Sequence, residues 1–238
     1  MSNDVKIPGI VNVTGQRDLP ASGFSSWLSE IRSALASEGG VDVPCGDCAA
    51  CCKSSYFIHV GPEETETLAR IPKELLFAAP SQAEGKLLMG YDEKGRCPML
   101  IDDKCSIYEN RPLTCRSYDC RIFPAAGIDV GETDKVLLSQ RAQRWEFSFP
   151  TGRDRTQHAA VRDTATFLRD HPECFPKGVP NNPTQLAILA IKAYDVFVGY
   201  QDDRSRDRQK PSDLDIVNAI KTAILQFEDS RGGSKQAQ

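Results

Sequence analysis

Eight of the nine cysteines in this 238-residue chain lie in one stretch, between residues 45 and 120. They form two sets, which are Cys45, Cys48, Cys51 and Cys52 in the run CGDCAACC, and Cys97, Cys105, Cys115 and Cys120 further along. Thiolates bind zinc, iron and iron–sulfur clusters, and a short Cys-x-x-Cys spacing directs two sulfurs toward one centre. A metal that also takes sulfurs from the second set would hold two distant segments together. The pattern therefore predicts a metal site built from these eight thiolates.

The sequence leaves the grouping of these cysteines open. In a helix, Cys45, Cys48 and Cys52 would share one face and Cys51 would point away. The spacing of Cys45, Cys48 and Cys51 instead matches the opening of the bacterial ferredoxin run, whose remote fourth ligand is followed by proline, as Cys97 is here. Adjacent cysteines rarely face one centre. Cys51 and Cys52 therefore either serve different centres, or one of them is not a ligand.

Length and charge exclude several classes of protein. A chain of 238 residues can bury a core without crosslinks, so its cysteines are not required as disulfides. The formal net charge of −4 gives no electrostatic case for nucleic acid, and no apolar run approaches the ~20 residues of a membrane span. The first residues lack a secretory signal. We therefore expect a cytoplasmic protein whose partner is a metal ion or cluster, with no nucleic acid and no membrane, and with any protein partner left open.

The apolar periodicity predicts both helices and strands. The expected helices span 25–38, 62–71, 153–170, 182–199 and 211–229, and strands are expected at 56–60 and 145–149. Around the second cysteine set, residues 86–91 and 96–101 are predicted to form a hairpin that delivers Cys97. A tight turn at 102–104 then delivers Cys105, and Pro112 begins a short helix that carries Cys115.

Together these elements predict an α+β fold: a small cysteine-rich metal-binding domain with short strands and helices, followed by a mainly helical region. The expected divisions are an N-terminal arm and helix at 1–44 (the arm over 1–21), the cysteine domain at 45–125, a helical region packed on it at 126–229, and a disordered tail at 230–238. Residues 201–210 are typical of a charged linker.

The cysteine stretch resembles a known family. After CGDCAACC come Cys97-Pro98-x-Leu100, Cys105-Ser106-Ile107-Tyr108, Arg111-Pro112 and Cys115-Arg116-x-Tyr118-x-Cys120. This string is similar to that of the YkgJ-type cysteine-cluster proteins, which carry the CxxCxxCC domain and are described as zinc- or iron-chelating. The resemblance covers about a third of the chain. It implies that the eight cysteines are the ligands and that four other side chains surround the metal without binding it: Tyr108, Arg111, Arg116 and Tyr118.

The leading expectation is a protein that holds an iron–sulfur cluster, with the four-iron type favoured, or zinc. Eight cysteines without histidine favour a cluster, whereas all-cysteine sites are equally normal for structural zinc. The alternative is a metal-dependent enzyme that acts on a protein substrate by methyl or electron transfer, since flagellin lysine N-methylases are related by the same motif. The additional regions of those chains and a G-x-G-x-x-G turn are missing here, and no other catalytic motif is present. A third hypothesis is a disulfide-bonded exported protein.

Several other reactive side chains have simpler interpretations. Cys174 stands alone in the run HPEC and is interpreted as an idle thiol. His59 is expected to be a packed or surface histidine rather than a ligand. Trp145, Phe147 and Phe149 alternate with polar residues and are expected to lie in the core.

Overall fold

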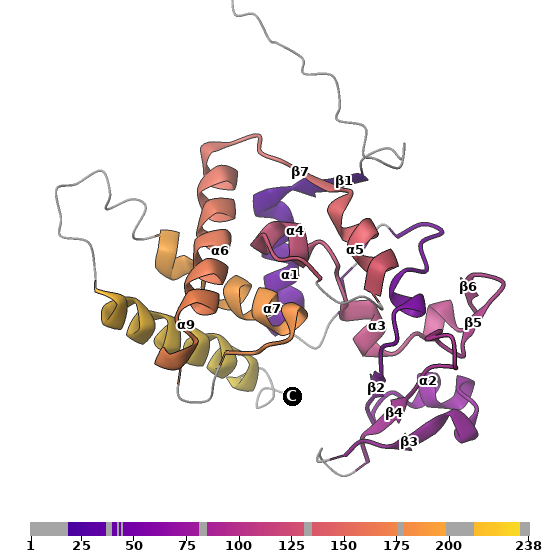
Figure 1. Ribbon diagram of the computed structural model, residues 1–238. Helices are drawn as coiled ribbons and strands as arrows, with labels where there is room; N and C mark the ends of the chain where they lie inside the picture. Colours follow the sequence, from indigo (N-terminus) through magenta and orange to yellow (C-terminus); the bar gives the residue numbers. More distant parts are fainter. Residues whose placement is uncertain are drawn as a thin grey trace, which may run out of the picture.

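The computed structural model describes residues 19–36, 40–41, 43, 45–80, 85–130, 135–175, 179–198 and 212–233. Within them the chain has the expected α+β fold, with longer helices on one side and short strands and turns on the other (Figure 1). The predicted linker at 201–210, most of the predicted arm and the tail residues 234–238 lie outside the described residues. None of the described helices is both long enough and apolar enough to cross a membrane.

The helical side consists of elements from both ends of the chain. These are β1 (Leu19–Gly23), α1 (Phe24–Ala36), α4 (Ile122–Ala126), α5 (Val136–Gln143), β7 (Trp145–Ser148), α6 (Gly152–Asp170), η5 (Pro172–Cys174), α7 (Pro183–Ala193) and α9 (Asp213–Gly233). They enclose the main hydrophobic core, whose buried residues include Trp27 of α1, Phe123 of α4, Leu168 of α6 and Ile191 of α7. A core of this size does not depend on metal for its burial of apolar surface.

The cysteine-rich side lies between α1 and α4 in the sequence. Its elements are η1 (Cys51–Lys53), β2 (Ile58–Val60), α2 (Thr65–Arg70), η2 (Lys73–Leu75), β3 (Leu76–Ala78), β4 (Leu87–Met89), β5 (Leu100–Ile101), β6 (Lys104–Cys105), η3 (Tyr108–Asn110) and α3 (Leu113–Ser117). A second, much smaller hydrophobic cluster gathers here, from Val60, Ile71, Met89, Met99 and Ile107. Elements this short need support beyond their own apolar packing.

The first strand was not predicted from the sequence. β1 occupies the end of the stretch expected to be an arm, and it pairs with β7 in parallel, with Leu19 opposite Trp145. Pro20, Ala21 and Gly23 give β1 none of the alternation or β-branched composition typical of a strand. The pair brings the segment that follows the cysteine region against the segment that precedes it.

The strand pairing around Cys97 also differs from the prediction. β4 pairs antiparallel with both β2 and β3, and residues 96–101 do not pair with it, so the predicted hairpin of 86–91 with 96–101 is wrong. The turn at Asp92 to Arg96 does form, through the hydrogen bond from Asp92 N to Arg96 O at 2.8 Å. The predicted turn at 102–104 is confirmed as the link between β5 and β6, with positive φ at Asp102 and Asp103.

The helix predictions hold more closely because local signals fix the ends. α6 begins with a capping box, in which Thr151 and Asp154 satisfy each other's backbone N–H groups. α7 begins at Pro183, after Asn182, whose side chain accepts a hydrogen bond from Gln185 N. α9 extends to Gly233, beyond the predicted end at 229 and into the residues expected to be a tail.

Candidate metal centre

The eight cysteines lie on short elements or in the turns between them. Cys45 and Cys48 are in the loop after α1, Cys51 and Cys52 are in η1, Cys97 precedes β5, Cys105 ends β6, Cys115 is in α3 and Cys120 follows α3. A backbone hydrogen bond of 2.7 Å from Cys97 N to Cys52 O joins the two cysteine-bearing segments. All nine cysteines of the chain are in the described residues, and all are free thiols.

Three cysteines gather on the side of the main core, and we call them the core-side group: Cys45, Cys48 and Cys120. Cys120 is buried in the main core. Burial, together with the nearby Cys51 and Cys48 sulfurs, raises the pKa of Cys45 to about 11. Burial likewise raises the pKa of Cys120 to about 12, and Cys45 adds to this shift. These mutual effects place the three sulfurs in one region.

The other three cysteines of the second set form the sheet-side group: Cys97, Cys105 and Cys115. Cys97 and Cys105 pack against the smaller hydrophobic cluster. Burial is the largest cause of the raised pKa of Cys97, and the Cys105 sulfur adds to it. Burial also raises the pKa of Cys115 to about 12, with contributions from Cys97 and Cys105. Two members of this group, Cys97 and Cys105, thus pack on a different hydrophobic cluster from Cys120.

Cys51 lies at the junction of the two groups. Its sulfur raises the pKa of Cys45 and Cys120 on one side, and the pKa of Cys97 and Cys115 on the other. Its own pKa is raised well above the usual range, first by a side-chain hydrogen bond with Cys52 and then by burial. The adjacent pair Cys51 and Cys52 therefore lies between the core-side group and the sheet-side group.

These shifts describe the protein without metal. Thiols with a pKa of about 11 or 12 carry their protons at neutral pH, because burial disfavours the thiolate. A metal cation that binds here must displace those protons, and its positive charge replaces the missing solvation. Eight free thiols, one buried and seven partly buried, are thus chemically suited to a thiolate-binding metal.

One sulfur accepts a hydrogen bond from outside the cysteine region. The indole Nε1–H of Trp145, on β7, donates to Cys120 Sγ at 3.1 Å. This bond lowers the pKa of Cys120 against the larger effect of burial. The guanidinium of Arg141 stacks on the Trp145 ring at 4.8 Å and donates from Nη2 to Cys45 O at 3.1 Å. The hydrogen bond from Trp145 to Cys120 was not predicted from the sequence, because the alternation of residues around Trp145 indicates only that its side chain lies in the core.

A buried ion pair lies directly beside Cys120. Arg121 and Asp119 are both almost fully buried, with 2.9 Å between Arg121 Nη2 and Asp119 Oδ2. The same carboxylate oxygen accepts a 2.8 Å hydrogen bond from Trp27 Nε1 of α1, and Arg121 Nη1 donates to Ala21 O of β1 at 3.3 Å. The pair thus fixes Cys120 to the N-terminal strand and helix.

Two of the four side chains that the sequence placed around the metal lie near cysteine sulfurs. Arg111 acts electrostatically on Cys115, and its guanidinium stacks on the Tyr108 ring at 3.7 Å. Arg111 Nε is buried, and no hydrogen-bond acceptor among the described residues reaches it. Tyr118 lies close to Cys120 and Cys51, and burial raises the pKa of its phenol above the ordinary value.

The other two lie at the surface. Tyr108 is 49% exposed and acts through its stacking with Arg111. Arg116 is exposed, donates from Nε to Arg111 O at 3.1 Å, and lines a pocket together with Glu64 and Arg111. Arg116 therefore positions Arg111 and is not brought to a sulfur.

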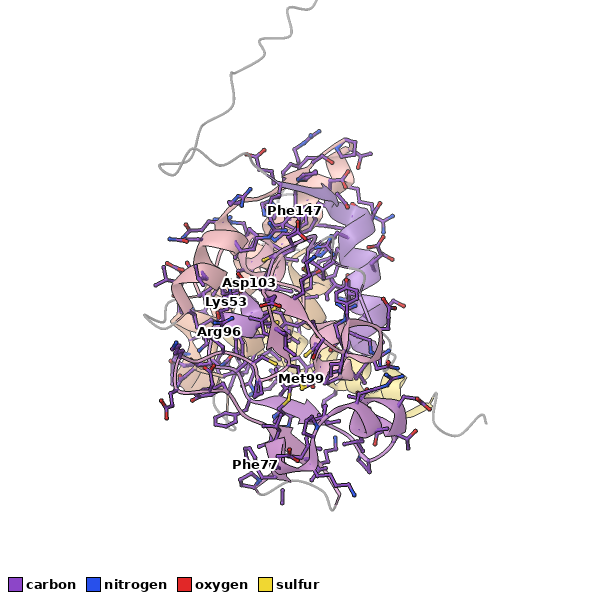
Figure 2. The ribbon with its side chains drawn as sticks, turned by 90° about the vertical axis from the view of Figure 1, so that its right-hand side faces the viewer. Lys53, Phe77, Arg96, Met99, Asp103 and Phe147 are labelled. Atoms are coloured by element: carbon purple, nitrogen blue, oxygen red, sulfur yellow. The ribbon has the colours of Figure 1, made fainter. Side chains whose placement is uncertain are left out.

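An ion-pair cluster at the surface connects the turns that carry the ligands. Asp103 in the β5–β6 turn meets Lys53, which follows Cys52, at 2.8 Å and Arg96, which precedes Cys97, at 3.5 Å. Figure 2 shows the three side chains together on one face. Lys53 holds the pKa of Asp103 below its usual range. Three chain segments that hold cysteines are thereby held near one another.

An open pocket of about 400 Å³ reaches the core-side group. Cys45 and Cys48 line it on one side, and its other walls include Lys53, Arg141 and Arg144.

Among the eight cysteines, all in the described part of the chain, no three sulfurs lie within 4.8 Å of one another. His59 is exposed, as expected of a histidine that is not a ligand.

Residues 44–141 match the family model CxxCxxCC, whose description is "Putative zinc- or iron-chelating domain". The matched segment contains all eight cysteines and ends at Arg141, which contacts Cys45. The match therefore supports metal binding by this part of the chain. Neither the search of curated proteins nor the search of solved structures gave a match.

Proposed function

We propose that the chain is a metal-binding protein of the YkgJ type that holds iron–sulfur clusters through its eight clustered cysteines. The observation that carries the proposal is that Cys120 belongs to the main core and Cys97 and Cys105 pack on the smaller cluster, while the hydrogen bond from Cys97 N to Cys52 O joins the two cysteine-bearing segments. A cluster with four cysteine ligands needs one more sulfur for each group. Cys51 and Cys52 supply these two, one to each group.

The four-iron cluster is favoured over zinc by two features of the sequence. Cys45, Cys48 and Cys51 have the spacing that opens the bacterial ferredoxin run, and Cys97 is followed by proline, as is the remote fourth ligand of that run. The eight cysteines also occur without a histidine beside them, which suits a cluster. The buried Arg111 Nε is available as a donor to such a cluster, whose charge with four thiolates is negative. Free thiols of this kind persist in the cytoplasm, where we place the protein.

Anaerobic purification followed by metal and sulfide analysis tests the proposal. We expect iron and acid-labile sulfide in equal amounts, with a broad visible absorption that bleaches on reduction. A colourless protein with stoichiometric zinc would show that zinc is the occupant and would overturn the cluster.

Single substitutions test the grouping. Cys115→Ser should remove the iron of the sheet-side group and retain that of the core-side group, so that about half of the iron remains. Cys120→Ser should do the reverse. The matched control is Cys174→Ser, a thiol outside the eight, which should leave iron and sulfide unchanged. Complete loss of iron in both ligand variants, with the fold retained, would instead indicate one shared centre.

The pocket beside Cys45 and Cys48 favours a second candidate function, a metal-dependent enzyme that acts on a protein substrate by methyl or electron transfer. Cys45 and Cys48 are reachable there from solvent. Basic and acidic side chains together make the wall of the pocket polar: Lys53, Arg141, Arg144, Asp47 and Asp103.

Blocking the pocket tests this second candidate. Gln140 is exposed on α5 and lines the pocket, whereas Gln143 is exposed on the same helix and does not line it. If the pocket is the route to a redox centre, Gln140→Trp should slow reduction by dithionite, and the control Gln143→Trp should not. Equal rates in both variants would remove the pocket from the electron path.

A further inference from the structure

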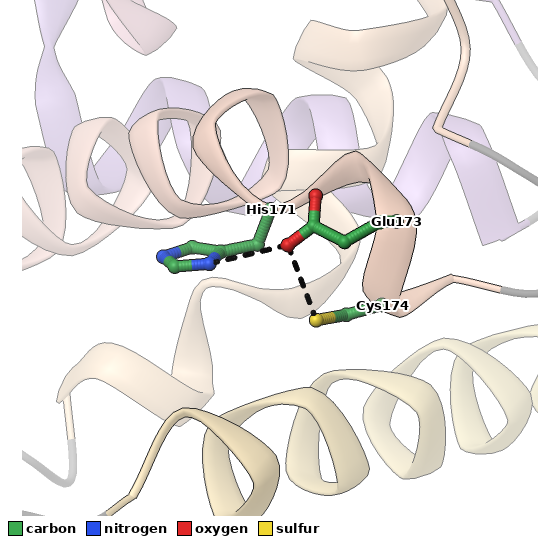
Figure 3. A group of neighbouring side chains, drawn as sticks. All are labelled: His171, Glu173 and Cys174. Atoms are coloured by element: carbon green, nitrogen blue, oxygen red, sulfur yellow. Dashed lines mark hydrogen bonds and ion pairs between the residues drawn. The ribbon is translucent and has the colours of Figure 1, made fainter.

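We propose that His171, Glu173 and Cys174 form a separate binding site for a divalent cation of the zinc type. An imidazole nitrogen, a carboxylate oxygen and a thiol sulfur lie within 4.8 Å of one another at the end of α6, outside the segment that matches the chelating family. The sequence alone indicated an idle cysteine at this position. Figure 3 shows the three side chains converging.

The local backbone explains the convergence. His171 ends α6, and Pro172 begins the single 3₁₀ turn η5, which is closed by a hydrogen bond from Cys174 N to His171 O at 3.2 Å. In a 3₁₀ turn, side chains three residues apart eclipse one another, so His171 and Cys174 point to the same side. Pro172 restricts the backbone of this turn, which holds the two ligands in position before any ion binds.

Glu173, which lies between His171 and Cys174 in the sequence, provides the third ligand atom. Its Oε1 lies 3.8 Å from His171 Nδ1 and accepts a hydrogen bond from Cys174 Sγ at 3.6 Å. Zinc binds nitrogen and oxygen at about 2.0–2.2 Å and sulfur at about 2.3 Å, so ligand atoms around one tetrahedral ion stand roughly 3.3–3.8 Å apart. The two separations from Glu173 Oε1 are at or within that range, and the His171 nitrogen and the Cys174 sulfur lie within 4.8 Å of each other, so the three atoms are near the spacing that zinc requires.

The surroundings of the turn support a binding site. The His171 ring packs on the Phe167 ring, with 4.4 Å between the centroids, which fixes the direction of the imidazole. The Asp213 carboxylate, in the first turn of α9, is within electrostatic reach of the Cys174 thiol, as is the Lys221 ammonium. A water molecule can take the fourth position. Imidazole, carboxylate and thiolate together suit zinc and not the hard cations magnesium or calcium.

Residue-resolved alkylation tests the site in the full chain. Cleavage after Arg169 and Lys177 gives a peptide, 170–177, in which Cys174 is the only cysteine, so the other eight thiols do not interfere. We expect zinc to slow iodoacetamide alkylation of Cys174 about tenfold at ten times the dissociation constant. Magnesium at the same concentration should give no protection.

Substitutions separate a three-ligand site from zinc binding to a lone thiol. His171→Ala and Glu173→Gln should each reduce the protection, and Glu173 is exposed enough that its change should leave the fold intact. The control is His59→Ala, which removes an exposed histidine elsewhere and should retain full protection. Equal alkylation rates with and without zinc would overturn the proposal. Full protection in the two ligand variants would also overturn it.

Discussion

The indole of Trp145 donates its N–H to Cys120 Sγ, although the two residues are 25 positions apart and lie on different elements. Trp145 follows the segment that matches the chelating family, so this contact comes from the rest of the chain. A hydrogen bond to a thiolate ligand stabilises its negative charge. The helical part of the protein therefore acts directly on the core-side group.

Replacing Trp145 by Phe should weaken metal retention at the core-side group. The change keeps an aromatic ring and removes only the donor, and hydrogen bonds to charged groups contribute about 1.5–3 kcal/mol. We expect release of metal to a chelator about tenfold faster. The control Tyr194→Phe keeps an aromatic ring and removes a core hydroxyl that accepts from Gln157 Nε2 and contacts no cysteine, and it should alter release much less. Identical release from wild type and Trp145→Phe would contradict the role of this bond.

The buried pair of Asp119 and Arg121 should contribute strongly to stability in its intact form. Asp119→Ala leaves the Arg121 guanidinium buried without its counter-charge, which costs about 3–5 kcal/mol. Chemical denaturation should show this loss in the free energy of unfolding. The control Asp170→Ala breaks an exposed pair with Arg169 and should cost less than about 1 kcal/mol. Similar losses of unfolding free energy in both variants would show that the burial of the Asp119–Arg121 pair does not determine its contribution to stability.

The capping carboxylate of Asp154 should make stability depend on pH in the acid range. Hydrogen bonds from the Thr151 side chain and from Ser25 N hold the pKa of Asp154 below its usual range. Because the folded pKa is below the unfolded value of about 3.9, the stabilisation is complete well above pH 4 and is lost as the pH falls toward the folded pKa.

Asp154→Asn tests this dependence. The variant should be less stable than the wild type near pH 7, and the difference between them should shrink as the pH falls below about 4. Urea denaturation at a series of pH values measures it, with Asp170→Asn as the control on the same helix. A difference between variant and wild type that stays constant down to the lowest pH would contradict the role of the charge.

Metal removal should loosen the cysteine-rich side and leave the helical side folded. The smaller hydrophobic cluster has five buried residues, whereas the main core joins α1, α4, α6 and α7. After chelation, hydrogen exchange should rise in β2–β6 while α6 and α7 stay protected. Exchange measured by mass spectrometry with and without chelator gives this comparison. A uniform rise over both sides would mean that the main core also depends on the metal.

The parts of the fold that the sequence predicted are those with a local cause. Helical periodicity predicted α6 and α7, and the Asp-Asp sequence predicted the turn that links β5 and β6. β1 and the partners of β4 depend on contacts between distant segments, which leave no local pattern. α4 and α5 were also missed, because each is too short to give a clear period.

The same distinction applies to the candidate metal site: the features with a local sequence signal were predicted, and those that depend on contacts between distant segments were not. Spacing was enough to single out the eight cysteines, and Arg111 followed from the motif. The direction of the Trp145 N–H depends on how β7 packs against Cys120, which no spacing encodes. Asp119 and Arg121 flank Cys120 in the sequence, but their burial results from α1 and β1, which are about 90 residues or more distant.

The placement of the cysteine region between α1 and α4 also determines the order in which the protein can be completed. All eight clustered cysteines are synthesised before Trp145 and α6, at about 5–20 residues per second. Trp145 follows Cys120 by 25 residues, so Cys120 is made about 1–5 s before the indole that donates to its sulfur. The helices that complete the main core around Cys120 are made later still.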